Sequence, residues 1–368
     1  MKNRLEAINK KLKEKNLDAV IITNPFNIFY LTGFKGVSPT EREAILIVNP
    51  TNATLITARL YQIEAKNLES SKLKIKIANE RNEINEFIKD SLAKVKNVGF
   101  EEHNLKFSEF IQFKKLLKAP PAGGKLTPTG HLIEDLRVIK TADEIKNIER
   151  AQIISQKALE LVLKTLKIGQ TEVEIAEKLA SIIKSLGAGG LAFETIVASG
   201  QNSAKPHHIT GHRRLTKNDT LLFDFGAKYQ DYCADLSRTI FIGRALGEQA
   251  KIYHHVAKAQ QKAIAKIKSG ARASSAHKTA ISHFKEHKLD ESFTHSLGHG
   301  IGLEVHEKPS LSAKSKDVFR EGMVFSVEPG LYFPAWGGIR IEDLVAIKNN
   351  KAQIIGKSAQ FTQLALKA

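Results

Sequence analysis

Two aspartates lie in an apolar stretch of the chain, where an isolated carboxylate would be costly. Asp224 directly follows three apolar residues, and Asp235 comes eleven residues later, after a turn that contains Gly226. Two strands joined by a turn of this length can place both carboxylates side by side. Because a buried carboxylate needs a partner or a metal ion, the pair could bind a metal. A hairpin whose aspartates serve turns or caps is the alternative, and these two residues alone do not decide between them.

The second half of the sequence repeats this pattern with two glutamates. Glu328 ends the apolar stretch MVFSVE, and Glu342 lies within IRIEDLVAI, close to Arg340. A single glutamate in a strand is usually exposed or salt-bridged, and Arg340 could be that partner. The separations are nevertheless similar, since the two aspartates are 11 residues apart and the two glutamates are 14 residues apart. Equivalent carboxylates from two related halves would converge across a pseudo-twofold axis.

Three histidines lie within twelve residues of a glycine-rich segment. His295, His299 and His306 belong to THSLGHGIGLEVHE, whose glycines disfavour a regular helix and allow the backbone to approach a site closely. A second group, His207 and His208, precedes the first aspartate. A single histidine is more often a core or surface residue than a ligand. Three histidines accompanied by four strand carboxylates indicate a metal site.

Four carboxylates and one imidazole form a hard, oxygen-rich donor set. Such donors suit Mn²⁺, Fe²⁺ or Co²⁺ better than a structural zinc site, which favours thiolate and imidazole. Five ligands exceed what one small ion with an open position needs, and they suit two ions about 3.5–4 Å apart. Such a pair lowers the pKa of a bridging water and yields a hydroxide nucleophile near neutral pH.

Helix-capping patterns and apolar strands predict how these residues are positioned. T-x-x-E patterns at Thr141 and Thr171 predict two helices, which end near Leu166 and Gly187. Apolar strands are predicted at 193–198, 220–225, 232–242, 323–328 and 339–347, and a second pair of helices at 249–268 and 274–288. The order of a helix pair followed by strands therefore occurs twice, which predicts two related halves.

In the first third of the chain, predicted helices and strands follow a different order, which indicates a separate domain. Helices are expected at 3–15, 82–94 and 108–118, and strands at 19–23, 44–48 and 54–57. Two prolines and two glycines follow at 119–124, where a helix cannot continue. We therefore predict two domains, residues 1–125 and 126–368.

Composition and charge narrow the class of protein. The 368 residues are 42% hydrophobic and 26% charged, which is ordinary for a globular protein. Cys233 is the only cysteine, which excludes a disulfide within the monomer and a cysteine-built metal site. Apolar stretches are too short to span a bilayer and the N-terminus is charged, so we expect a cytoplasmic protein without a membrane partner. The net charge of +17 comes from dispersed lysines without a recognition motif, so no specific nucleic-acid partner is expected.

The segment 126–368 resembles the pita-bread metallopeptidases, the family of aminopeptidase P, prolidase and methionine aminopeptidase. The resemblance rests on LIEDLRVIKTADEIKNIERA, PHH, DFGAKYQDYCADLSRT, HSLGHGIGLEVHE, EGMVFSVEPGLY and GGIRIED, which occur in this order. The first 125 residues, with NPFNIFYLTGF, resemble the creatinase-type N-terminal domain and favour the branch that cleaves Xaa-Pro bonds. The resemblance implies an α+β protein, with a C-terminal pita-bread fold of pseudo-twofold halves. A smaller α/β domain would precede it, wall the active site and contribute to a homodimer.

By the same resemblance, five residues match the metal ligands of the family, with Asp235 and Glu342 in the bridging positions. These five are Asp224, Asp235, His299, Glu328 and Glu342. The implied cofactors are two divalent metal ions, with Mn²⁺ favoured and Co²⁺, Fe²⁺ or Zn²⁺ as alternatives. Ser237 stands where threonine is usual in the family, and little change is expected because both side chains offer a hydroxyl.

Four further residues match substrate-contacting positions of the family. His207 matches a histidine that contacts substrate, although its neighbour His208 makes this assignment ambiguous. His295 matches a histidine that lines the pocket beyond the scissile bond, and His306 matches one that contacts the reacting carbonyl. Arg340 matches an arginine that holds either the carboxylates of the site or the substrate.

The implied activity is hydrolysis of the Xaa-Pro bond at the N-terminus of proline-containing peptides, by a hydroxide that bridges the two metals. Glu328 would act as general base, and His306 and His207 would stabilise the oxyanion. An aminopeptidase P-like activity is preferred, and an Xaa-Pro dipeptidase (prolidase) that acts only on dipeptides is the alternative. A non-catalytic pita-bread module that binds nucleic acid or protein is a further alternative, which the complete ligand set disfavours.

Overall fold

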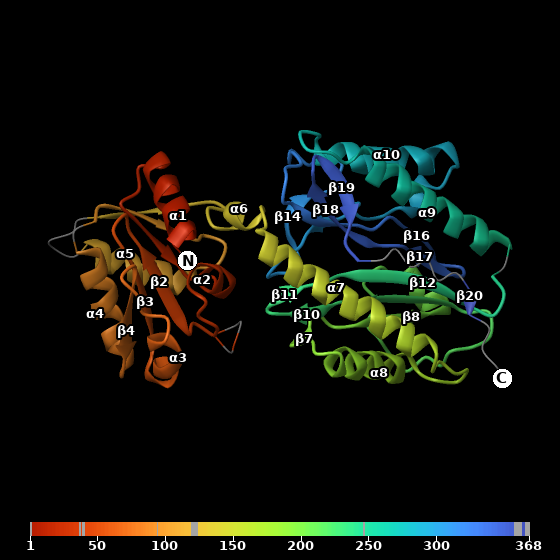
Figure 1. Cartoon of the computed structure of the whole chain (residues 1–368), viewed down its shortest axis with the longest axis horizontal. Helices are drawn as coiled ribbons and strands as arrows, with labels where there is room; N and C mark the ends of the chain where they lie inside the picture. Colours follow the sequence, from red (N-terminus) through yellow and green to blue (C-terminus); the bar gives the residue numbers. More distant parts are fainter. Residues whose placement is uncertain are drawn as a thin grey trace. The chain divides into compact units, whose positions relative to one another are not determined.

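The computed structural model describes residues 2–36, 38, 41–93, 95–118, 124–245, 247–356 and 363–364. The chain divides into two compact units, residues 1–137 and 138–368. Figure 1 colours the first unit from red to yellow and the second from yellow to blue. None of the described helices is long and apolar enough to cross a membrane.

The N-terminal unit is built on one mixed sheet of six strands. The strands are β1 (Ala19–Ile22), β2 (Ala44–Val48), β3 (Ala53–Ala58), β4 (Leu73–Ala78), β5 (Asn97–Phe100) and β6 (Lys125–Pro128), in the order β4-β3-β2-β1-β5-β6. Its helices are α1 (Lys2–Glu14), α2 (Pro25–Thr32), α3 (Gln62–Lys66), α4 (Arg81–Leu92), α5 (Phe107–Lys118) and α6 (Glu134–Arg137). Apolar residues of α4 and α5 pack on the central strands and form the core of this unit.

The predicted boundary at residue 125 falls within β6. The first compact unit extends twelve residues further along the chain, to residue 137. The Pro-Pro and Gly-Gly segment on which that prediction rested lies largely outside the described residues, because 119–123 are not described. β6 pairs in parallel with β5 and so extends the N-terminal sheet. Beyond it, Nη1 of Arg137 donates a hydrogen bond of 2.8 Å to Oδ1 of Asn27, which holds α6 in the same unit.

The first half of the C-terminal unit consists of a helix pair on a strand layer. The helices are α7 (Ala142–Leu163) and α8 (Glu172–Ser185), and both begin with the predicted capping boxes at Thr141 and Thr171. The strands are β7 (Gly190–Leu191), β8 (Ile196–Ser199), β9 (Thr220–Phe225), β10 (Ala227–Tyr229), β11 (Tyr232–Cys233) and β12 (Leu236–Ile242). Helices and strands share one apolar core, so the strands are fixed from one side by the helix pair.

The second half repeats this arrangement. Its helices are α9 (Gly247–Lys266) and α10 (Ala273–Glu286), and their apolar residues share a core with the strands that follow. These strands are β13 (His299–Gly300), β14 (Glu307–Ser310), β15 (Val324–Val327), β16 (Gly330–Phe333), β17 (Gly337–Arg340), β18 (Asp343–Lys348) and β19 (Lys351–Ile354), and β20 (Gln363–Leu364) joins the sheet of the first half. Figure 1 shows the strands between the two helix pairs. The order predicted for the two halves is therefore confirmed.

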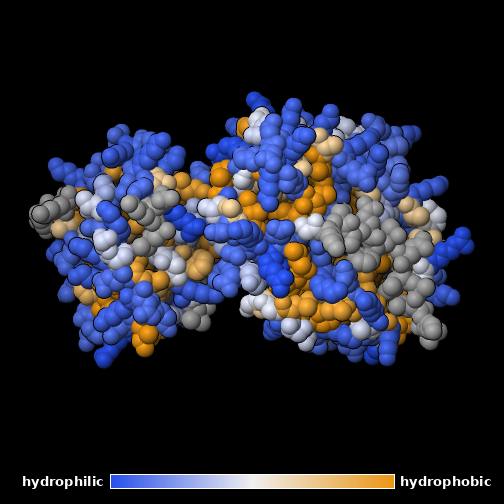
Figure 2. Space-filling model, viewed as in Figure 1, coloured by the Kyte–Doolittle hydropathy of each residue, from blue (hydrophilic) through white to orange (hydrophobic). Residues whose placement is uncertain are grey.

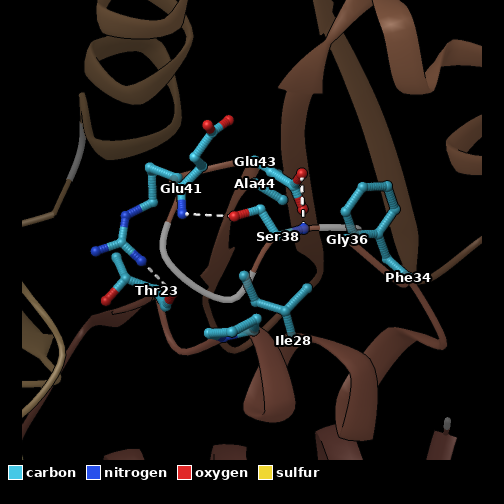
Figure 3. Close-up of a pocket in the computed structure, with 10 residues that line it drawn as sticks. Thr23, Ile28, Phe34, Gly36, Ser38, Glu41, Glu43 and Ala44 are labelled. Atoms are coloured by element: carbon cyan, nitrogen blue, oxygen red, sulfur yellow. Dashed lines mark hydrogen bonds between the residues drawn. The ribbon is translucent and has the colours of Figure 1, made fainter. Parts of the chain in front are cut away.

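Hydrophilic side chains spread over the visible face of each unit rather than gathering in one patch (Figure 2). In the N-terminal unit, Figure 3 shows a small pocket whose lining includes Ile28, Phe34, Ser38 and Glu43. The backbone amide of Ser38 donates a hydrogen bond to Glu43 there. The volume of the pocket is about 20 Å³. Such a space holds a water molecule but no peptide.

Candidate active site

All nine residues predicted for the site line a single pocket of the C-terminal unit. This cavity of about 460 Å³ is lined by Asp224, Asp235, His207, His295, His299, His306, Glu328, Arg340 and Glu342. Apolar side chains of Phe193, Ile196 and Val305 line it as well. The structure therefore brings together residues that are spread over 136 positions of sequence, from 207 to 342.

Antiparallel strand pairing places the four carboxylates in two matching pairs. Asp224 lies on β9 opposite Ser237 of β12, and Asp235 directly precedes β12. In the second half, Val327 of β15 lies opposite Asp343 of β18. Glu328 directly follows Val327, and Glu342 directly precedes Asp343. The carboxylates of Glu328 and Glu342 therefore also lie at the end of a strand pair. Each half thus contributes two carboxylates, each on or directly beside one of two paired strands.

The predicted strands 232–242 and 339–347 are each interrupted at the site. The first divides into β11 and β12 around Asp235, and the second divides into β17 and β18 around Glu342. A continuous strand points successive side chains to alternate faces. Asp235 and Glu342 thus lie in short irregular segments between two strands, and both line the pocket.

Glycines on both sides of His299 allow its strand to approach its neighbours closely. A Cβ at Gly298 would overlap the carbonyl oxygen of Ser326, and a Cβ at Gly300 would overlap that of Lys308. Nδ1 of His299 donates to the carbonyl of Gly300 at 3.1 Å, which leaves Nε2 directed at the carboxylates. Nε2 lies 3.3 Å from Oε1 of Glu328 and 3.6 Å from Oδ2 of Asp235.

The donor set has the features of a cation site. Oδ1 of Asp235 and Oε1 of Glu342 are buried and, among the described residues, have no hydrogen-bond partner. Ligand atoms of Asp235, His299 and Glu342 lie within 4.8 Å of one another. A buried carboxylate oxygen without a hydrogen-bond partner is energetically unfavourable unless a positive charge compensates it. These residues therefore fit a divalent metal ion.

Burial and mutual repulsion shift the pKa values of these carboxyl groups. Burial, together with Glu328 and Asp224, raises the pKa of Glu342 to about 8. Burial and the neighbouring carboxylates also raise the pKa of Asp235 well above its ordinary value. Burial alone would lower the pKa of His299, but Glu328 and Glu342 raise it to about 9. The excess negative charge is what a bound cation would neutralise.

Arg340 holds the first aspartate and the surrounding strands. Its side chain is buried, and Nη2 donates a hydrogen bond of 2.5 Å to Oδ2 of Asp224. Nε donates to Oγ of Ser237 at 2.8 Å, and Nη1 donates to the hydroxyl of Tyr332 at 2.9 Å and to the carbonyl of Pro206 at 3.2 Å. The contact to Pro206 also anchors the loop that carries His207.

The two adjacent histidines of the first loop point to different surroundings. His207 lines the pocket. Nε2 of His208 lies 2.8 Å from Oε2 of Glu172, which also accepts a hydrogen bond from the Gly211 backbone amide. The geometry therefore leaves His207 as the one available to a bound substrate.

His295 and His306 line the pocket as neutral rings. Nδ1 of His295 donates to the carbonyl of Ser296 at 2.8 Å, so Nε2 accepts from the hydroxyl of Tyr332 at 2.9 Å. Burial lowers the pKa of His295. Burial and the adjacent His299 lower the pKa of His306, whose ring centre lies 4.3 Å from that of His299.

Sequence reasoning did not identify three side chains that organise the site. Tyr332 bridges Arg340 and His295, and Ser326 donates to Oε1 of Glu328 at 3.0 Å. Glu172 holds His208. The signal for Ser326 was present in FSVE, because residues two apart share one face of a strand. Tyr332 and Glu172 carried no such local signal.

Comparisons with known proteins identify two domain families in the chain. The family model described as Creatinase/Prolidase N-terminal domain matches residues 4–139, and Metallopeptidase family M24 matches residues 146–349. The Xaa-Pro dipeptidase of Pyrococcus furiosus is 37% identical over 358 residues, which cover 97% of this chain and 99% of that protein.

Solved structures give the same assignment. An Xaa-Pro dipeptidase from Bacillus anthracis superimposes with a TM-score of 0.91 at 31% identity, covering 98% of this chain and 99% of that one. An X-Pro aminopeptidase from Thermotoga maritima gives a TM-score of 0.85 at 31% identity, with 96% and 99% covered. These matches confirm the predicted two-domain fold and the resemblance to pita-bread peptidases. Since the family model spans more than half of the sequence and the relatives span nearly all of it, the chain belongs to metallopeptidase family M24.

Proposed function

We propose that the chain is an Xaa-Pro dipeptidase that works with two divalent metal ions. The observation that carries this proposal is the pocket in which four carboxylates and His299 converge, with two buried carboxylate oxygens left unpartnered among the described residues. We propose Asp224, Asp235, His299, Glu328 and Glu342 as the ligands, and Mn²⁺ as the preferred ion because carboxylates dominate the set.

The choice of substrate class rests on the relatives. Proteins named Xaa-Pro dipeptidase are similar to this chain over nearly its full length, in sequence and in structure. They support the dipeptidase alternative better than the aminopeptidase P-like activity preferred from the sequence. The sequence could not separate the two, because the segments that carry the ligands are shared by both. The likeness to the Thermotoga maritima X-Pro aminopeptidase keeps aminopeptidase activity as the second candidate.

Metal ions bound at these residues would polarise the peptide carbonyl and lower the pKa of a water molecule. Glu328 would accept the proton of the attacking water and pass it to the proline nitrogen. Burial would raise its pKa, but the hydrogen bond and charge of His299 lower it to about 2, so the side chain is an unprotonated carboxylate near neutral pH. Ser326 fixes its orientation through Oε1.

The remaining pocket residues would position the substrate. His306 and His207 would donate hydrogen bonds to the carbonyl oxygen as negative charge develops on it. The proline ring would lie against His295 and the apolar side chains of Phe193, Ile196 and Val305, which line the same cavity. We also propose that the protein is a homodimer and that the N-terminal unit helps to enclose the site, as the resemblance implies.

Three peptides distinguish the candidate activities. The manganese-loaded protein should hydrolyse Ala-Pro, with little turnover of Ala-Pro-Ala and none of Ala-Ala-Ala. Turnover of Ala-Pro-Ala with release of alanine would instead make the protein an aminopeptidase P. A preference for Ala-Ala-Ala would contradict proline specificity, and absence of bound metal and of all turnover would leave a non-catalytic module.

A further inference from the structure

Three histidines gather on the outer helix pair of the C-terminal unit, and none of them lines the active-site pocket. His255 lies on α9, His283 lies on α10, and His287 follows the last residue of α10. A spacing of four residues places His283 and His287 on one side of the helix. Figure 1 shows α9 and α10 side by side, and the two helices are in contact. The fold thus joins imidazoles from two helices in one cluster.

The ring nitrogens of this cluster are close enough to share one small ion. Nδ1 of His255 lies 3.5 Å from Nε2 of His283, and one nitrogen from each of the three rings lies within 4.8 Å of the others. The ring centre of His287 is 4.2 Å from that of His255 and 4.9 Å from that of His283. Two nitrogens bound to a tetrahedral zinc ion are about 3.4 Å apart. Small side-chain rotations would therefore close the cluster around an ion.

We propose that His255, His283 and His287 form a second metal site, which binds Zn²⁺ with water in the fourth position. Imidazole nitrogens suit zinc, whereas carboxylates and water suit Mn²⁺. The three ligands here are all imidazoles, while the active-site pocket supplies four carboxylates and one ligating imidazole. The two sites share no residue and differ in the metal that they prefer.

The surroundings of His255 and His283 favour the neutral imidazole that metal binding needs. Burial lowers the pKa of His283 to about 4, and Lys262 and the neighbouring histidines shift it in the same direction. Burial and His287 also lower the pKa of His255. His287 is exposed at the surface, so an ion can enter the cluster from solvent.

Lys262 competes with an ion for His283. Its ammonium donates to Nδ1 of His283 at 3.1 Å. A neutral ring that accepts at Nδ1 carries its proton on Nε2, and that nitrogen faces His255. Metal binding through Nε2 therefore requires the ring proton to sit on Nδ1 instead, and Lys262 must release the ring.

Glu286 lies near both His283 and Lys262, and it can pair with each of them after the hydrogen bond between them breaks. Its Oε2 lies 3.9 Å from Nδ1 of His283 and 3.6 Å from Nζ of Lys262. A metal-bound His283 would donate Nδ1–H to this carboxylate, while Lys262 would pair with the same side chain. Hydrogen bonds from a ligating histidine to a carboxylate fix the ring and raise its basicity. An ion shared by α9 and α10 would also stabilise the folded chain.

Zinc binding to the full-length chain tests this proposal through matched histidine variants. Equilibrium dialysis against Zn²⁺ and metal analysis should give one equivalent more for the wild type than for His287→Ala or His255→Ala. His254→Ala is the control, because His254 is the exposed neighbour of His255 and is not one of the three ligands. The same difference should persist in an Asp235→Ala background, which separates this site from the active-site pocket. Peptide hydrolysis by the manganese-loaded enzyme should be unchanged in His287→Ala.

Two further variants test the roles of the neighbouring charges. Lys262→Met should tighten zinc binding because the competing ammonium is removed, and Glu286→Gln should weaken it by about tenfold. Zinc should raise the thermal midpoint of the wild type but not that of His287→Ala. Equal zinc content in the wild type, His255→Ala and His287→Ala would overturn the proposal, and so would an equal loss in His254→Ala.

Discussion

The hydroxyl of Ser237 donates a hydrogen bond of 2.8 Å to Oε2 of Glu342. The same hydroxyl accepts a hydrogen bond from Nε of Arg340, and the backbone amide of Glu342 donates to the carbonyl of Ser237 at 3.1 Å. Ser237 lies on a strand of the first half and Glu342 lies between strands of the second. These contacts join the two halves and fix one oxygen of Glu342, while Oε1 stays unpartnered among the described residues.

Replacement of Ser237 should therefore change metal affinity according to whether a hydroxyl remains. Ser237→Thr keeps the hydroxyl and should bind metal and hydrolyse Ala-Pro as the wild type does. Ser237→Val has nearly the same shape as the threonine variant but lacks the hydroxyl, and its metal affinity should fall about 10–100-fold. Metal titration of both variants measures this difference, and equal affinity would show that the hydroxyl does not orient Glu342.

The two neighbouring histidines of the pocket should separate by role. His299→Ala should lose bound metal, because Nε2 of His299 faces the carboxylates of Glu328 and Asp235. His306→Ala should keep its metal but lose about 10²–10³-fold in kcat, the effect of removing a hydrogen-bond donor to the oxyanion. Metal content and kcat measured on both variants decide the matter. An equal loss of metal in both would show that His306 is also a ligand.

The metal-free protein should lose stability as the pH rises. Glu342 has a pKa of about 8 and His299 one of about 9, both above their ordinary values. A group whose pKa is raised by folding stabilises the fold at low pH, and that contribution is lost as the pH rises through the folded value. The pKa of Glu328, lowered to about 2, adds nothing to the change above pH 5 or so, since its stabilisation is lost only in acid.

We therefore expect the thermal midpoint in chelator to fall between about pH 5 and about pH 9. Glu342→Gln should reduce the slope, because the amide does not titrate. Glu64→Gln removes an exposed carboxylate of the N-terminal unit and serves as the control. Added metal should restore stability most at the alkaline end. An unchanged slope in Glu342→Gln would contradict the shifted pKa.

Tyr332→Phe should destabilise the fold by about 1–3 kcal/mol, because the guanidinium of Arg340 and the ring of His295 each lose a buried partner. Tyr253→Phe is a matched control. The hydroxyl of Tyr253 is buried and has no hydrogen-bond partner among the described residues, so its removal should be neutral or stabilising. Denaturant unfolding of both variants compares them directly, and similar losses would mean that the Tyr332 hydrogen bonds contribute little.

Local sequence signals predicted much of this fold. The capping boxes at Thr141 and Thr171 gave the helix starts, and the strand around Asp224 was predicted with its observed bounds of 220–225. The β4 strand was not predicted, although LKIKIA alternates apolar residues with lysine, which is the pattern of a half-buried strand.

The site could be predicted as a set of residues but not as a geometry. A carboxylate in an apolar stretch is energetically unfavourable when buried unless a metal ion or another cation compensates its charge. This signal can be found in the local sequence. The breaks in the strands at Asp235 and Glu342 depend on pairing between distant segments, such as the amide of Glu342 with the carbonyl of Ser237. The link from Arg340 through Tyr332 to His295 likewise exists only after the sheets have formed.

Paired measurement of metal content and Ala-Pro hydrolysis in Asp235→Ala tests the central claim most directly. Asp235 is buried between Glu342, Asp224 and His299, and its Oδ1 has no hydrogen-bond partner among the described residues. The wild type should bind two ions in the pocket and hydrolyse the dipeptide. The variant should bind less metal and show no hydrolysis, with an unchanged circular dichroism spectrum. Full hydrolysis by a variant that still holds two ions in the pocket would contradict the account.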